Sequence, residues 1–87
     1  MTDIDPRPPH AAPYEPIACA RYSEYEVAIL HRQKLRLRWL EGNVVYEQAV
    51  LPLDLKTECH EEFLICRDAA GAVHTIRLDQ IHKMGPA

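Results

Sequence analysis

The chain has 87 residues, of which 47% are hydrophobic and 26% are charged, and its formal net charge is -3. A chain of this length supports one small hydrophobic core, which excludes a two-domain architecture. The acidic balance argues against a uniformly basic nucleic-acid-binding protein but leaves room for a local basic patch. No apolar run approaches the roughly 20 residues of a membrane-spanning helix, and the N-terminus lacks the features of a signal peptide. We therefore expect a cytoplasmic protein with no membrane partner.

Residues 1–13 differ in composition from the rest of the chain. They contain four of the seven prolines and almost no large apolar side chain. Burial in such a segment cannot offset the entropy lost when its backbone is ordered. We predict a disordered, proline-rich tail, followed by a single domain over residues 14–87.

One helix is predicted near the start of this domain. Ser23 and Glu26 have the Ser-x-x-Glu spacing of a capping box. Glu24 adds negative charge where the helix dipole is positive. These signals predict a helix from about Ser23 to Arg32.

Alternating side chains predict a β-hairpin after the helix. Residues 34–40 alternate between basic and apolar side chains, and residues 41–43 form a tight turn into a second strand at 44–50. Pro52 has no backbone N–H, so it should end or bulge the second strand and leave residues 53–57 as a bend.

The remaining sequence predicts a second hairpin and a closing strand. We expect strands at 62–67 and 72–77 around a turn at 68–71, then one helical turn at 78–81 and a short strand at 81–84. One helix followed by five short, bent strands indicates a mainly β fold of the small-barrel type. Much of the core should come from Leu35, Leu37, Trp39, Phe63, Ile65 and Ile76.

The cysteines and histidines do not indicate a metal site. Cys19, Cys59 and Cys66 form an odd set without CxxC spacing, and no pair of histidines has zinc-ligand spacing. We expect reduced thiols, no metal, no cofactor and no disulfide needed for folding. An enzyme is not expected either, because no glycine-rich phosphate loop is present and no motif places a base beside a nucleophile.

Two charged surfaces are candidates for binding a partner. Lys34, Arg36 and Arg38 share one face of the predicted first strand, where they are placed to contact RNA phosphates. The more ordinary interpretation of these three cations is a solvated strand face. On the helix, carboxylates lie close to tyrosines, a combination that suits a basic, nucleic-acid-binding partner protein. Capping and solubility explain those carboxylates equally well.

The opening of the domain carries a distinctive motif. Residues 14–19 read Tyr-Glu-Pro-Ile-Ala-Cys, followed by Tyr22 and Glu26, and residues 76–81 read Ile-Arg-Leu-Asp-Gln-Ile. Together with the strand spacing, these features resemble the Rho-binding antiterminator (Rof) family over residues 14–84. The resemblance implies an Sm-like fold, with a five-stranded bent sheet or barrel and one N-terminal helix, and no catalysis. It also implies binding to the hexameric transcription terminator Rho, obstruction of its primary RNA-binding site, and antitermination.

The resemblance also suggests where Rho would bind. Tyr22 and Glu26 match the family, and we add Glu24 and Tyr25 from charge and position. The helix entrance of the family is richer in acids than the corresponding Ala20, Arg21 and Ser23 of this chain. Direct nucleic-acid binding is not expected under this interpretation. The alternatives are an Sm-like RNA-binding module that uses Lys34, Arg36 and Arg38, and a small structural domain without separable activity.

Overall fold

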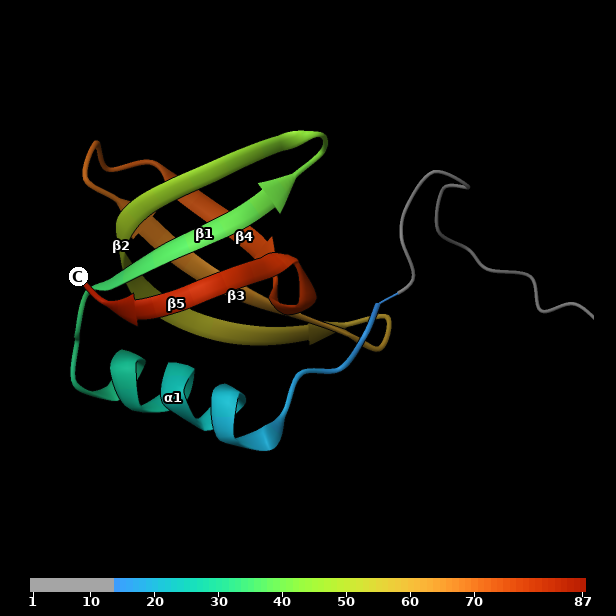
Figure 1. Cartoon of the computed structure of the whole chain (residues 1–87). Helices are drawn as coiled ribbons and strands as arrows, with labels where there is room; N and C mark the ends of the chain where they lie inside the picture. The colour runs from blue at the N-terminus through green and yellow to red at the C-terminus, as the bar shows by residue number, and fades with distance from the viewer. Residues whose placement is uncertain (1–13) are drawn as a thin grey trace, which may run out of the picture.

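A computed structural model describes residues 14–87, and the predicted tail at 1–13 lies outside the described residues. The elements in chain order are the helix α1 (Cys19–Leu30), the strands β1 (Leu35–Glu41), β2 (Val44–Glu58), β3 (Glu61–Asp68) and β4 (Val73–Arg77), the 3-10 turn η1 (Leu78–Gln80) and the strand β5 (Ile81–Pro86). The strands form one antiparallel sheet in the order β4-β3-β2-β1-β5 (Figure 1). The expected fold class, mainly β with a five-stranded bent sheet and one N-terminal helix, is confirmed.

β2 belongs to both halves of the sheet. Its first part pairs with β1 and its second part with β3, and Val50 takes part in both ladders. A register shift lies between Pro52 and Asp54. Pro52 therefore bulges the strand, as predicted, but does not end it. The predicted bend at residues 53–57 is wrong, because β2 continues through this segment and residues 54–58 pair with β3.

α1 begins at Cys19 rather than at Ser23. Its N-cap is Ala18, which makes no side-chain cap hydrogen bond, so the predicted capping box is not used and Ser23 lies inside the helix. Tyr22 and Tyr25 pack into or against the core of the sheet. Burying this stripe extends the helix towards the N-terminus, because packing outweighs a cap that contributes about 1 kcal/mol.

α1 ends in a Schellman motif. Arg32 adopts a left-handed conformation, with φ of 52°. The N–H of Gln33 donates to the carbonyl of Ala28 at 2.9 Å, and the N–H of Arg32 donates to Ile29 at 3.2 Å. The helix therefore stops two residues earlier than predicted, and the chain turns directly into β1. No helix within residues 14–87 combines the length and apolar character required to cross a membrane.

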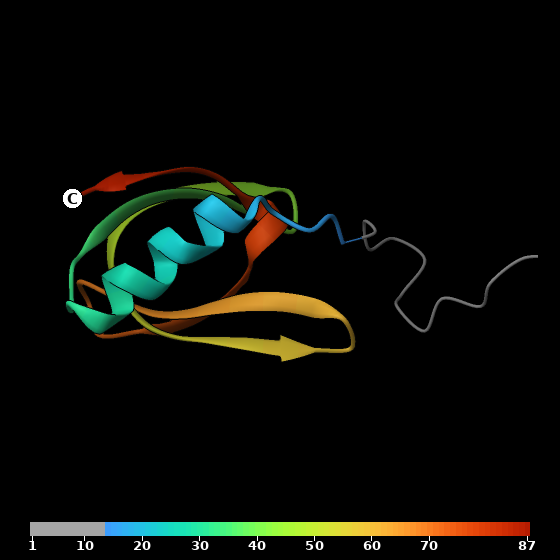
Figure 2. The same ribbon diagram turned by 90° about the horizontal axis from the view of Figure 1, so that it is seen from below.

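The core lies between α1 and the concave face of the sheet (Figure 2). The buried side chains are Tyr25, Ala28, Leu35, Leu37, Trp39, Val50, Leu64, Cys66, Ile76, Leu78 and Ile81. On β3, Leu64 and Cys66 are buried, whereas Phe63 and Ile65 are only half-buried. The predicted inward face of β3 is therefore wrong. Residues 63–66 are all apolar, so their sequence does not indicate which face of β3 is buried. The buried face is set instead by the pairing of β3 with β2 beyond the bulge.

Trp39 lies at the centre of this core with no exposed surface. Its ring stacks on Tyr46, with centroids 5.5 Å apart and an interplanar angle of 21°, and meets the edge of His74 at 5.6 Å. The indole N–H donates to Glu41 at 3.3 Å. The largest side chain of the core thus joins β1, β2 and β4.

Replacing Trp39 with Ala should lower the free energy of unfolding by roughly 3 to 5 kcal/mol, because the cavity cannot fully collapse inside a small sheet. Chemical denaturation would measure this loss. Val45→Ala is the matched control: this side chain is 59% exposed and its removal should change stability by no more than about 0.5 kcal/mol. Equal midpoints for the two variants would contradict the central role of Trp39.

Asp68 organises the turn between β3 and β4. Its Oδ1 accepts the N–H groups of Ala70 and Ala72, each at 2.9 Å, and its Oδ2 lies 2.8 Å from Nε2 of His74. The His74 hydrogen bond is the largest cause that lowers the pKa of Asp68, and the two amides add to it. The same carboxylate thereby fixes the turn and orients the imidazole that packs on Trp39.

Asp68→Asn should lower the unfolding midpoint at neutral pH. Because the pKa of Asp68 is lowered in the folded state, its contribution is present above the pKa of an unfolded aspartate, about 3.9, and is lost as the pH falls through the lowered value. The difference between wild type and variant should therefore shrink in strong acid. A difference that stays constant over the whole acid range, followed by thermal melts, would exclude this carboxylate as the source.

Candidate functional site

α1 carries all four residues predicted to contact Rho, but they do not share one surface. Tyr22 and Glu26 are four residues apart and lie on the same flank of the helix. Glu24 lies on the other flank, where it lines a groove beside β5. Tyr25 faces the core. Figure 2 shows α1 between these two environments, with β5 on one side and the β2–β3 hairpin on the other.

Tyr25 is a core residue rather than a surface aromatic. It has no exposed surface, so the expectation that its ring is available to a partner is wrong. Burial raises the pKa of its phenol to about 12, and the positive charge of Arg21 opposes this rise. Its hydroxyl makes no hydrogen bond of ordinary geometry with the described residues. The helical spacing from Tyr22 to Tyr25 and Ala28 is the signal that would have assigned it to the core.

Two tyrosines lie within the electrostatic influence of carboxylates where α1 faces β2 and β3. The Tyr14 hydroxyl donates to Oε1 of Glu62 at 2.8 Å. The pKa of Tyr22 is raised, first by partial burial and then by the negative charges of Glu62, Glu26 and Asp54. We call this set, Tyr14, Tyr22, Glu26, Asp54 and Glu62, the tyrosine–carboxylate surface. Asp54 and Glu62 are far from α1 in the sequence, and only the fold brings them near Tyr22.

The segment before α1 is fastened to the sheet at several points. The N–H of Glu15 donates to Oδ2 of Asp79 at 3.0 Å. The guanidinium of Arg77 lies over the Tyr14 ring, 5.8 Å from its centroid, and bonds Asp79 at 2.6 and 3.0 Å. Burial and the Glu62 hydrogen bond raise the pKa of Tyr14. The Tyr-Glu-Pro-Ile opening is therefore part of the folded surface.

The basic strand face is smaller than the sequence predicted. Arg38 bonds Glu47 at 3.0 Å, and Nε of Arg36 lies 4.0 Å from the same carboxylate. Lys34 precedes β1, so the expectation that three cations share the strand is correct for only two of them. Lys83 of β5 is aligned with Arg38 and adds a cation that sequence reasoning missed. The face is thus an arginine pair bound to a carboxylate, with one neighbouring lysine.

The three cysteines differ in exposure. Cys19 and Cys59 are exposed and Cys66 is buried, and all three are free. Burial raises the pKa of the Cys66 thiol to about 12, which makes it a poor nucleophile. Across residues 14–87, no three His, Cys, Asp or Glu side chains are grouped so as to hold a metal ion.

Comparison with models of known families and with curated proteins found no match. The fold is similar to part of a solved structure, that of proteasome accessory factor B/C (PafBC) of Arthrobacter aurescens, with a TM-score of 0.70 and 23% sequence identity. The match covers 84% of this chain and 12% of that chain, so this chain spans only a small part of the length of PafBC. A likeness at this identity shows a shared fold and carries no function with it.

Tyr14→Phe should reduce the free energy of unfolding by about 1 kcal/mol at neutral pH, because it removes one hydrogen bond to a carboxylate. The raised pKa of Tyr14 favours the neutral phenol, so this contribution is present below the unfolded pKa of about 10 and is lost as the pH rises through the folded value. Denaturation on either side of the unfolded pKa would measure it. Tyr46→Phe removes the hydroxyl of a ring that stacks on Trp39; it is the control and should change the free energy of unfolding by no more than about 0.5 kcal/mol.

Proposed function

We propose that this chain binds the transcription terminator Rho and obstructs its primary RNA-binding site, so that Rho-dependent termination is reduced. It would act in the cytoplasm, by binding alone, without catalysis or a cofactor. The proposal starts from the resemblance of residues 14–19 to the opening of the Rho-binding antiterminator family. In the structure, this opening lies against the sheet and contributes Tyr14 to the tyrosine–carboxylate surface.

The tyrosine–carboxylate surface is the observation that carries the proposal. A protein that binds single-stranded RNA presents cations to the phosphates and slots in which bases stack. A compact surface of carboxylates and partly exposed phenols has the complementary charge and the complementary ring chemistry. Tyr22 and Glu26, which match the family, both belong to this surface. It is therefore suited to occupy an RNA site on a basic protein.

The RNA-binding alternative has less support. Arg36 and Arg38 face Glu47, which neutralises part of their charge, and Lys34 lies outside β1. The ring of Tyr46, on the neighbouring strand, stacks on buried Trp39 rather than beside the arginines. No feature of this face favours RNA over an ordinary solvated surface.

Two matched variants test which face binds Rho. Glu26→Gln with Asp54→Asn removes two negative charges from the tyrosine–carboxylate surface, and Arg36→Gln with Arg38→Gln removes two positive charges from the strand face. The first variant should weaken binding to purified Rho by roughly tenfold or more, most strongly at low salt, where screening is weakest. The second should bind Rho within about twofold of wild type, since it changes only exposed charges away from the interface. Titration calorimetry at two salt concentrations would measure both.

A transcription assay separates binding from function. Adding the wild-type protein to a Rho-dependent terminator should increase read-through, and the Glu26→Gln, Asp54→Asn variant should do so much less. If only the arginine variant loses Rho binding, the interface lies on the strand face instead. Failure of the wild-type protein to bind Rho at low salt, with retention on RNA instead, would overturn the proposed function.

A further inference from the structure

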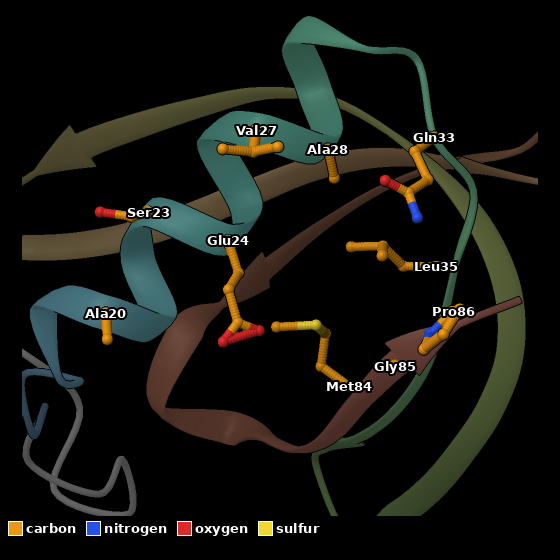
Figure 3. A pocket seen from close by; sticks show the side chains of 10 residues that line it. All are labelled: Ala20, Ser23, Glu24, Val27, Ala28, Gln33, Leu35, Met84, Gly85 and Pro86. Atoms are coloured by element: carbon orange, nitrogen blue, oxygen red, sulfur yellow. The ribbon is translucent and has the colours of Figure 1, made fainter.

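A groove runs along the flank of α1 that faces away from the tyrosine–carboxylate surface. It lies between the helix and β5, has a volume of about 420 Å³, and is shown in Figure 3. Its lining includes the apolar side chains of Ala28, Leu35 and Met84, and small residues such as Ala20 leave it open. The Schellman motif at the end of α1 brings Gln33 to its rim.

Glu24 is the one charged residue among the described residues that line this groove. Figure 3 shows its side chain reaching from α1 towards the thioether of Met84. It makes no salt bridge with any residue in the range 14–87. A carboxylate placed this way beside an apolar floor is complementary to a side chain that combines an apolar stem with a cationic head. Lysine and arginine have this form.

The helix ridge next to the groove is unusually apolar for an exposed surface. Val27, which lines the groove, is 50% exposed, and Leu30, three residues further along the helix, is 77% exposed. Exposed faces of helices on small proteins are normally polar. Apolar side chains with carboxylates on both flanks have the arrangement of a protein interface, with an apolar centre and a charged rim.

We infer that the groove receives a lysine or arginine side chain of the partner protein. Its apolar stem would lie on Ala28 and Met84, and its charged head would reach Glu24, while the partner surface covers Val27. This inference rests on the proposed function, because a surface that binds RNA phosphates is rich in such side chains. A partner lying along the ridge would reach the groove on one flank and Glu26 on the other, so Rho would be held at two places.

Three substitutions in the groove test this inference through the affinity for purified Rho. Glu24→Gln removes the charge while keeping the shape, and should weaken binding roughly fivefold, more at low salt. Ala20→Phe places a ring at the rim of the groove and should weaken binding roughly tenfold by excluding the stem. Gln33→Glu adds a second carboxylate and should strengthen binding. Glu47→Gln, which removes one negative charge from the far face of the sheet, is the control and should bind like wild type.

Ala20→Phe decides the inference if its circular dichroism spectrum and melting temperature match those of wild type. Wild-type affinity of this variant would overturn the groove as a binding site, even if Glu26→Gln with Asp54→Asn still loses Rho and so supports the proposed function. Should Ala20→Phe fail to fold, Glu24→Gln decides instead, and an affinity equal to that of Glu47→Gln would overturn the inference. If the wild-type protein does not bind Rho, both the proposed function and the groove as a Rho-binding site are overturned.

Discussion

The bend of β2 at Val50 and Pro52 is the constraint on which the rest of the structure depends. β2 is long enough to pair with β1 in one half and β3 in the other, and Val50 is the last residue that pairs with β1. Pro52 lies just beyond it, so its missing N–H costs no hydrogen bond to β1. The register shift at Pro52 then increases the local bend and twist. The bulge therefore contributes to the curvature with which the sheet closes over Trp39.

The bend also brings together groups that are far apart in the sequence. It turns the second half of β2 and the start of β3 towards α1, which places Asp54 and Glu62 near enough to Tyr22 for their negative charges to raise its pKa. The other flank of the helix faces β5 and Met84 instead. One helix therefore has two flanks of different chemistry, because one flank faces polar strand ends and the other faces the edge of the sheet.

The sequence was informative where a pattern is local. The alternation over residues 35–39 assigned the buried face of β1, and Gly42, with φ of 62°, forms the turn expected between β1 and β2. It was misleading where two local signals compete. Ser23 and Glu26 have ideal capping spacing, yet the packing of Tyr22 and Tyr25 moves the helix start to Cys19.

The candidate site was harder to predict than the fold, because it depends on pairing between distant segments. Glu24, Tyr25 and Glu26 are adjacent in the sequence, and the sequence alone predicts that they act as one cluster. In a helix, however, successive residues point in different directions, so the three side chains face the groove, the core and the β2–β3 hairpin respectively. Asp54 carries no motif, and only the register of β2 beyond its bulge places it near the helix.

The small residues at the helix entrance help to form the groove. The first turn of α1 contains no acidic residue, and Ala20 and Ser23 line the groove rather than adding charge.

If Rho is the partner, long-range attraction falls to Glu26, Asp54 and Glu62 on the opposite flank. Such exposed charges mainly accelerate association and are screened by salt. Contacts inside a groove are desolvated and mainly slow dissociation. The two flanks of α1 would then divide the binding between them, with the carboxylates setting the rate of encounter and the groove setting the lifetime of the complex.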